Sequence, residues 1–293
     1  MKTVFGNDNH IIYWGDALEI LASTVEPESV DLIFADPPYN IGKRFANFTD
    51  KWPSEKAYAQ WCETWLDLCI SRLKSNGSMY VMCSTQGMPY LDLYLRNHMT
   101  ILSRIVWAYD SSGVQARKYF GSMYEPILFC VRNPKNYTFN TEPIKVKAKT
   151  GAERKLIDYR GATPKIYNST KIPGNVWNFP RVRYRMEEYE EHPSQKPETL
   201  LERIILASSN PGDLVLDPFS GTFTTSAVAQ RLGRRTIGIE QQESFVKIGL
   251  RRLQIQNSWN GERLIPPQKT FVRRNGSNTT KSIAQNTLSL FGD

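Results

Sequence analysis

The chain has 293 residues, 40% of them hydrophobic and 23% charged, with a formal net charge of +8. This length can hold one large domain or two modest ones with a self-supporting core. No stretch approaches the ~18 uncharged apolar residues of a membrane span, and the N-terminal segment lacks the apolar core of a signal peptide. The sequence thus argues against a membrane or secreted protein and predicts a cytosolic one.

The first half of the chain alternates apolar runs with segments of helical spacing. The strongest helical pattern, 57–77, places Trp61, Trp65, Leu68 and Leu73 on one side and stops at Gly77. In chain order the predicted elements are strands at 10–16 and 30–35 with a helix at 17–25 between them, the helix at 57–77, a strand at 78–84, a helix near 87–97, and strands near 101–109 and 126–132.

The second half begins with an irregular segment. Periodicity fades over 134–191, where Gly and Pro recur and basic and aromatic residues interleave. Regular elements then return as a helix at 196–209, a strand at 214–217, a helix at 223–232, a strand at 236–240 and a helix at 242–255. We expect a poorly ordered polar tail. The alternation predicts an α/β parallel sheet with a smaller irregular lobe, divided as 1–133, 134–191, 192–256 and 257–293.

The positive charge is concentrated in the irregular segment. Residues 134–185 hold 12 Lys and Arg against 3 Asp and Glu, whereas the rest of the chain holds 25 against 26. A face that binds a polyanion concentrates charge in this way, and so does a solvated lysine-rich loop.

The four cysteines are Cys62, Cys69, Cys83 and Cys130, without CxxC spacing and with only three histidines in the chain. We therefore expect reduced, buried thiols and neither a disulfide framework nor a metal site. None of the four follows a proline.

The stretch LVLDPFSGTFTTSAVA, 214–229, is typical of a strand, a turn and a helix start. Gly221 would let a ligand approach the backbone, and the helix start offers free N–H groups. Glu240 follows 19 residues later at the end of the next predicted strand, where a carboxylate can accept both hydroxyls of a ribose. The glycines depart from GxGxxG, which disfavours a nicotinamide or flavin dinucleotide. A structural turn with an unrelated glutamate is the alternative.

Two further runs carry candidate chemistry. In DPPYN, 36–40, a carboxylate beside a backbone carbonyl can receive both hydrogens of an exocyclic amine, and Tyr39 offers a ring on which a base can stack. The rigid prolines would fix this geometry, although the run can also be a plain turn. In HPSQKPETLL, 192–201, Lys196 stands where it could reach a ligand carboxylate, or the run simply begins a helix.

The motifs DPPY, HPSQKP and DPFSGTFTT, in this order, resemble those of the S-adenosylmethionine-dependent amino methyltransferases of DNA in their β-class, circularly permuted arrangement. The likeness covers nearly residues 1–255. It implies a Rossmann-like methyltransferase sheet with a small DNA-recognition lobe. In detail the chain is similar to the solitary enterobacterial adenine-N6 methyltransferases associated with a palindromic ATGCAT site.

The resemblance implies roles for the matching positions. Asp36 and the Pro37 carbonyl would orient the target amine, with Pro38 in the same motif and Tyr39 stacked on the flipped base. The positions implied for S-adenosylmethionine are Asp16 at the adenine amino group, Glu240 at the ribose, Asp217, Phe219, Gly221, Thr222 and Thr224 in the donor motif, and Ser194, Lys196 and Pro197 at the methionine end. Ser194 stands where threonine is commoner. Phe223 replaces a second glycine, where left-handed dihedrals would be costly.

Double-stranded DNA is the implied partner, and the base must leave the helix to reach the site. Two trios at alternate positions are the candidate DNA contacts, each on one side of an extended strand: Lys145, Lys147 and Lys149, and Arg181, Arg183 and Arg185. Any one of them can instead be solvated. The resemblance implies a cytoplasmic protein associated with the nucleoid. It leaves undecided whether the protein forms a homodimer.

Exocyclic nitrogen is the expected target, because methylation of a ring carbon needs a nucleophilic thiol and the chain has no Pro-Cys pair. Within the family, Asp at position 36 favours adenine N6 over cytosine N4. A non-catalytic DNA-binding protein and a nucleotide-dependent oxidoreductase are the remaining alternatives. The intact Asp36, Tyr39, Lys196 and Glu240 argue against the first, and the broken glycine pattern argues against the second.

Overall fold

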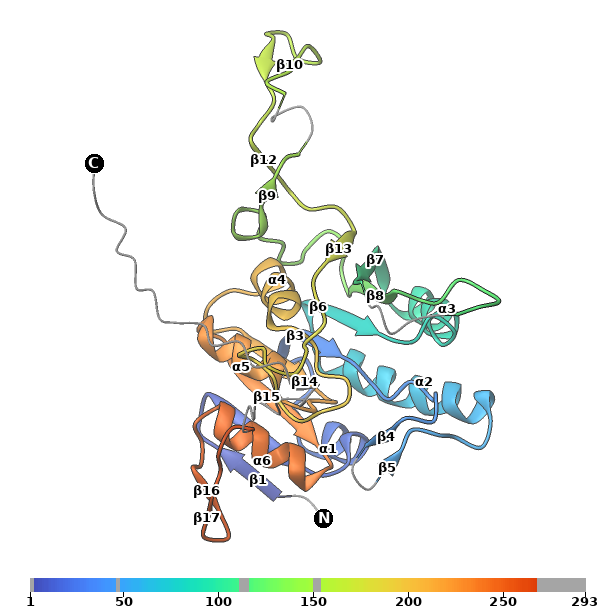
Figure 1. Ribbon diagram of the computed structural model, residues 1–293, viewed down its shortest axis with the longest axis vertical. Helices are drawn as coiled ribbons and strands as arrows, with labels where there is room; N and C mark the ends of the chain where they lie inside the picture. Colours follow the sequence, from blue (N-terminus) through green and yellow to red (C-terminus); the bar gives the residue numbers. More distant parts are fainter. Residues whose placement is uncertain (1–2, 46–47, 111–115, 150–153, 268–293) are drawn as a thin grey trace, which may run out of the picture.

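The structure, a computed structural model, describes residues 3–45, 48–110, 116–149 and 154–267. Across these ranges the centre is a nine-stranded sheet in the order β1-β2-β15-β14-β3-β6-β8-β7-β13 (Figure 1). The strands are β1 (Thr3–Gly6), β2 (His10–Trp14), β3 (Val30–Ala35), β6 (Leu73–Met82), β7 (Thr100–Ala108), β8 (Tyr124–Val131), β13 (Val176–Asn178), β14 (Leu214–Asp217) and β15 (Arg235–Glu240). Strands β2, β15, β14, β3 and β6 are mutually parallel, whereas β8 is antiparallel to both neighbours. The α/β parallel sheet is thus confirmed.

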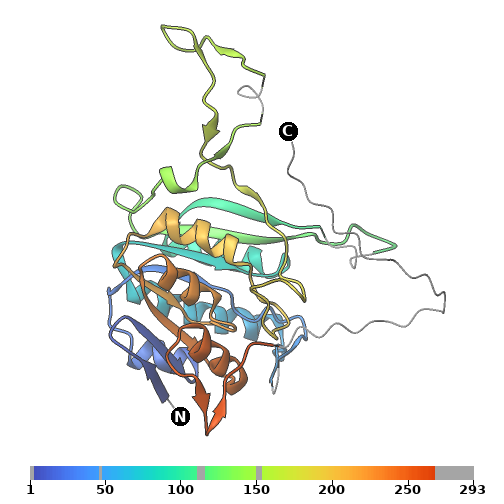
Figure 2. The same ribbon diagram turned by 60° about the vertical axis from the view of Figure 1, so that its left-hand side comes forward.

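Helices cover both faces of the sheet. Helices α1 (Ala17–Ser23), α2 (Glu55–Arg72) and α3 (Met88–His98) contribute to one core, and α4 (Glu198–Ser208) and α5 (Thr224–Arg231) to the opposite one, beside α6 (Glu243–Arg252) (Figure 2). The side chains of β3 alternate between the two cores. Ile33 and Ala35 pack in the core under α1, α2 and α3, and Leu32 and Phe34 pack in the opposite one. Burial on both sides explains why VDLIFA is almost continuously apolar.

The helix predicted at 57–77 is wrong at its C-terminal end. Helix α2 stops at Arg72, and Leu73 begins β6 opposite Val30. The Arg72 guanidinium donates to the carbonyls of Leu21 and Ala22 in α1, at 2.8 and 3.3 Å. Leu73 is fully buried, and a buried leucine satisfies a helix pattern and a strand pattern equally well. Spacing alone therefore could not place the boundary.

The described residues 142–149 and 154–171 form an arm whose base contacts α4 and whose remainder projects from the body of the molecule (Figures 1 and 2). Its described elements are short: η1 (Glu142–Ile144), β9 (Val146–Lys147) paired with β12 (Thr170–Lys171), and β10 (Ile157–Asp158) paired with β11 (Lys165–Ile166). No long helix occurs over the described residues of 134–191, as the loss of periodicity predicts. The chain then returns to the sheet as β13, beside β7. The division of the chain into four segments stays a prediction.

The two basic trios differ in backbone structure. Lys145, Lys147 and Lys149 are exposed and alternate with half-buried residues, as an extended segment requires. The strand predicted through Arg181, Arg183 and Arg185 is wrong. This stretch turns, because the amide of Met186 donates to the carbonyl of Arg183 and Arg185 has a φ of 85°.

The four cysteines are free and buried, which confirms the prediction of buried thiols. Burial raises the pKa of Cys62 and of Cys130 to about 12. Small hairpins complete the described chain, β4 (Arg44–Phe45) with β5 (Phe48–Thr49) and β16 (Ser258–Trp259) with β17 (Glu262–Arg263). The predicted polar tail lies mostly outside the described residues. Within them, no helix combines the length and apolar character needed to cross a bilayer.

Candidate active site

Three carboxylates lie along one edge of the sheet. Asp36 directly follows β3, Asp217 ends the neighbouring β14, and Glu240 ends β15 on its other side. Because the carboxyl ends of parallel strands share an edge, the sequence motifs meet there although they are far apart in the chain. They line a cavity of about 530 Å³.

The cavity sorts the predicted site residues into two groups. Those that line it are Asp16, Asp36, Pro37, Pro38, Tyr39, Arg181, Ser194, Lys196, Asp217, Phe219, Gly221, Thr222, Thr224 and Glu240. Those outside its lining are Lys145, Lys147, Lys149, Arg183, Arg185 and Pro197. Pro197 is buried and precedes α4, and the lysines belong to the arm.

The Asp36 side chain is held from two sides. Its Oδ1 accepts a hydrogen bond from the Tyr39 hydroxyl at 2.5 Å, and its Oδ2 lies 2.6 Å from Nζ of Lys196. The Tyr58 hydroxyl donates to the Pro38 carbonyl at 2.8 Å, and the amide of Tyr39 donates to Asp50 at 3.1 Å. These contacts fix the turn after β3 and aim its carboxylate into the cavity.

Glu125 is a second carboxylate at this point. Its Oε2 lies 3.0 Å from the Tyr39 hydroxyl and 3.5 Å from Nζ of Lys196. Burial raises the pKa of Asp36, and the positive charge of Lys196 opposes that rise. Burial acts to lower the pKa of Lys196, but Asp36 and Glu125 together leave it raised. The ammonium is therefore charged and favours an ionised Asp36.

Lys196 contacts the DPPY turn directly. Its ammonium lies against Asp36 and 5.6 Å from the centre of the Tyr39 ring, and its assignment to the methionine end of the donor stays a prediction. One lysine thus joins the HPSQKP run to the DPPY turn across 160 positions of the chain.

The turn after β14 is organised around Glu240. The amide of Gly221 donates to its Oε2 at 2.9 Å and the amide of Gln242 to its Oε1 at 2.7 Å. Burial raises the pKa of Glu240 to about 7. Gly221 has a φ of +49°, and a Cβ there would come within 3.1 Å of the His192 ring. A carboxylate at a strand end beside a close-fitting glycine suits a ribose, so these residues fit a nucleoside donor.

Asp217 lines the cavity and also holds this turn. Its Oδ1 accepts from the amide of Phe219 at 3.0 Å and its Oδ2 from the hydroxyl of Thr225 at 2.6 Å. Burial raises its pKa to about 7. Both oxygens are therefore engaged within the motif itself.

Phe223 adopts the left-handed conformation that the family pattern gives to glycine, with φ 57° and ψ 32°. Its ring is fully buried against Gly238 of β15 and Gly249 of α6, where a Cβ at Gly238 would meet the ring at 2.6 Å. The left-handed backbone costs about 1–2 kcal/mol, and burial of a phenylalanine returns about 1.5–3 kcal/mol. The turn therefore keeps its shape, with the ring packed between the sheet and α6.

Glu125 is the residue that the sequence reasoning missed. It stands before Pro126 at the start of β8, and because β8 is antiparallel to β6, this start lies at the edge where the parallel strands end. Asp36 and Asp217 also precede prolines. A search for acidic residues before proline at the beginning as well as at the end of each strand would have found it.

Aromatic and basic side chains complete the cavity wall. Trp107 and Tyr109, at the end of β7, line it, and the guanidinium of Arg181 lies 5.1 Å from the centre of the Tyr109 ring. The indole of Trp107 donates to the Phe179 carbonyl at 2.9 Å. Among the described residues no group of three or more His, Cys, Asp or Glu side chains could hold a metal ion.

Comparison with known proteins gives consistent results. The DNA methylase family model matches residues 30–251. The DNA adenine methyltransferase YhdJ of Escherichia coli K12 is 56% identical over 280 residues, covering 96% of this chain and 94% of that protein. The type II methyltransferase M.HpaI of Haemophilus parainfluenzae is 35% identical, covering 81% and 71%.

Solved structures show the same fold. The cytosine-N4-specific PvuII DNA methyltransferase matches with a TM-score of 0.62 and 19% identity over 89% of this chain and 92% of that chain. The M1.HpyAVI–SAM complex matches with a TM-score of 0.53 and 24% identity over 82% and 98%. The expected Rossmann-like methyltransferase sheet is thus confirmed, and the chain belongs to the DNA methylase family whose model spans its motifs.

Proposed function

We propose that the protein transfers the methyl group of S-adenosylmethionine to N6 of an adenine within a specific site of duplex DNA. The observation that carries this proposal is the Asp36 carboxylate, held by Tyr39 and Lys196 in the same cavity as the Glu240 turn. The name of the E. coli relative, a DNA adenine methyltransferase, supports adenine as the base.

The cofactor would be held by the turns at the carboxyl edge. Glu240 would accept the ribose hydroxyls, Asp16 would face the adenine amino group, and Gly221 would let the donor lie against the backbone. Asp16 also accepts the amide of Glu19 at 3.0 Å, which fixes its side chain at the start of α1. When bound, S-adenosylmethionine supplies a methyl group activated by a positively charged sulfur.

The chain's own contribution is position rather than a strong base. Asp36 and the Pro37 carbonyl receive the two hydrogens of the amine, which directs its lone pair at the methyl carbon. The amine would form the N–C bond as the C–S bond of the donor breaks, and S-adenosylhomocysteine, with a neutral sulfur, would be the leaving group. The surplus proton on nitrogen passes to Asp36 or to water. Lys196 supports this role because its charge favours the ionised carboxylate.

The cysteines argue against the thiol route to a ring carbon. All four lie in the described part of the chain and none belongs to the cavity lining. Burial raises the pKa of Cys83 as well, whereas a nucleophilic thiol needs a lowered one. An exocyclic amine is therefore the better target.

The aromatic wall suits a base that has left the helix. Flipping costs a few kcal/mol, and stacking on an aromatic ring returns about 1–3 kcal/mol per base. Tyr39, Trp107 and Tyr109 line the cavity and can provide this surface. The exposed lysines of the arm and the basic residues near Arg181 would contact phosphates.

The test uses two duplexes that differ only in the target site. One carries ATGCAT, which the resemblance suggests, and the other a scrambled site with the same base composition. After incubation with S-adenosylmethionine, nucleosides are separated and identified by mass spectrometry. We expect N6-methyladenine in the first duplex alone. N4-methylcytosine would replace the proposed base, and equal N6-methyladenine in both would reject the proposed site.

A further inference from the structure

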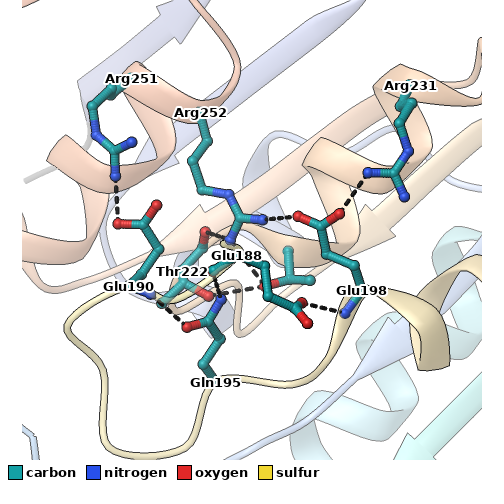
Figure 3. A network of polar contacts seen from close by, with 9 residues as sticks. Glu188, Glu190, Gln195, Glu198, Thr222, Arg231, Arg251 and Arg252 are labelled. Carbon is teal, nitrogen blue, oxygen red and sulfur yellow. Dashed lines mark hydrogen bonds and ion pairs between the residues drawn. The ribbon is translucent and has the colours of Figure 1, made fainter. Parts of the chain in front are cut away.

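A network of ion pairs and hydrogen bonds connects α6 with the Thr222–Thr224 turn and the start of α4 (Figure 3). Its centre is Arg252 of α6, whose side chain is 8% exposed. One guanidinium nitrogen, Nη1, donates to the carbonyl of Thr222 at 3.0 Å and to the hydroxyl of Thr224 at 3.1 Å. The other, Nη2, donates to Oε1 of Glu198 at 2.6 Å. One side chain therefore spans the donor turn and the start of α4.

Glu198 connects this network to the segment that carries Lys196. It is the first residue of α4, two positions after Lys196, and its amide donates to Oε2 of Glu188 at 2.7 Å. Gln195, which directly precedes Lys196, donates from its side chain to the Glu188 carbonyl at 2.5 Å, and its side-chain oxygen accepts a hydrogen bond from the amide of Glu190 at 2.8 Å. Glu190 also pairs with Arg251 of α6. The loop that carries Lys196 is thus tied to the same helix that supports the donor turn.

The shape of the side chain explains why an arginine stands at 252. A guanidinium is planar and presents several donors in a fixed fork, whereas a lysine ammonium is a single compact point of charge. Reaching a carboxylate on one side and two oxygens of a turn on the other requires the fork. A buried charge is also costly unless such partners surround it.

We propose that Arg252 is a positioning residue for the methyl donor, because it holds the Thr222–Thr224 turn and the Lys196 loop in one fixed arrangement. The inference rests on the proposed function, since both segments line the cavity assigned to the donor. Arg252 itself is absent from that lining and acts through the residues it bonds.

The chain provides a matched control in Arg231. Its guanidinium lies 2.5 Å from the other oxygen of Glu198, but its side chain is 51% exposed. Arg231 and Arg252 thus share one carboxylate, and of the two it is Arg252 that donates to the turn. Replacing each by lysine keeps the charge and removes the fork.

The experiment compares full-length Arg252→Lys, Arg231→Lys and wild-type protein. S-adenosylhomocysteine is titrated by calorimetry without DNA, and kcat and KM for the donor are then measured with DNA. We expect Arg252→Lys to raise the Kd about tenfold or more, as loss of charged hydrogen bonds does. Its kcat at saturating donor should fall by a smaller factor than its Kd rises, while Arg231→Lys should shift the Kd less than about twofold.

Equal Kd values for the two variants would overturn the inference, even if both melt at lower temperature. Should Arg252→Lys fail to fold, Glu198→Gln replaces it. This variant keeps the side-chain volume but weakens the ion pair on Arg252, so a wild-type Kd there would also overturn the inference. Failure of the donor assignment gives a different result, because the wild-type protein itself would then not bind S-adenosylhomocysteine. Failure of the proposed base or site would change the methylated product and leave these Kd values as expected.

Discussion

Two Asp-Pro turns leave adjacent strands at the same edge of the sheet, and they do different things. Asp217 gives both oxygens to donors of its own motif, while Asp36 meets Tyr39 and Lys196 inside the cavity. Burial raises the pKa of both carboxyl groups, to about 7 at Asp217. At Asp36 the ammonium of Lys196 is in direct contact and opposes this rise. The dipeptide alone does not make a catalytic carboxylate. Its partners from elsewhere in the chain do.

The difference between the two turns is tested by replacing each aspartate with asparagine. Asp36→Asn should lower kcat by about 10²–10³-fold, since the variant lacks one preorganised electrostatic partner of the reacting group. Its affinities for S-adenosylhomocysteine and DNA should stay within about threefold. Asp217→Asn should instead leave a folded protein with a smaller loss of kcat. Single-turnover kinetics of both variants on the same DNA duplex measure these losses. Similar losses of kcat in the two variants would contradict the different roles of Asp36 and Asp217.

The turn after β14 is held by packing, which Phe223→Ala tests. The ring is fully buried, and its loss leaves a cavity between Gly238 and Gly249. We expect the free energy of unfolding to fall by about 3–5 kcal/mol, measured by urea denaturation. Phe120→Ala is the control, because that ring is fully exposed and its loss should change stability by less than about 0.5 kcal/mol. A Phe223 variant as stable as the control would refute the packing role.

Donor binding and stability should both respond to pH through Glu240, which holds the turn after β14. The pKa of Glu240 is raised from 4.5 to about 7, so its contribution to folding is greatest below pH 4.5 and declines as pH rises towards 7. Affinity for the ligand should instead increase as pH rises, because the ionised carboxylate accepts the ribose hydroxyls. Affinity for S-adenosylhomocysteine should weaken up to about tenfold per pH unit below 7.

Calorimetry between pH 5.5 and about 8 measures this dependence, with Glu240→Gln as the comparison. The variant should bind more weakly at pH 8 and show a flatter profile. A variant profile as steep as that of the wild-type protein would assign the titration to another group.

The smallest effect is expected far from both turns, on the arm. Replacing Lys145, Lys147 and Lys149 by glutamine should reduce the slope of log Kd for DNA against log salt by about 2, because each neutralised phosphate adds about 0.9 to that slope. Lys145 already pairs with Glu142 at 2.6 Å, so its share should be the least. Methylation at saturating DNA should persist, and an unchanged slope would remove the arm from the DNA face.

The sequence predicts the parallel sheet and most of the cavity because these depend on local patterns. DPPY and DPFSGTFTT each lie at the end of an apolar strand, and such ends meet at one edge. Glu125 escapes this reasoning, since its role depends on β8 running antiparallel to β6. Phe223 looks strained in sequence because Gly238 and Gly249, which make room for its ring, are distant in the chain. The pairing of Lys196 with Asp36 is likewise a tertiary contact that no spacing reports.

The account depends most on the claim that the donor and the target base meet beside Asp36. A crystal structure of the protein with S-adenosylhomocysteine tests this directly. We predict the ribose on the Glu240 carboxylate and the sulfur directed towards Asp36, with the Tyr39 side of the cavity open for a base. Ligand density confined to a site away from both Asp-Pro turns would contradict it.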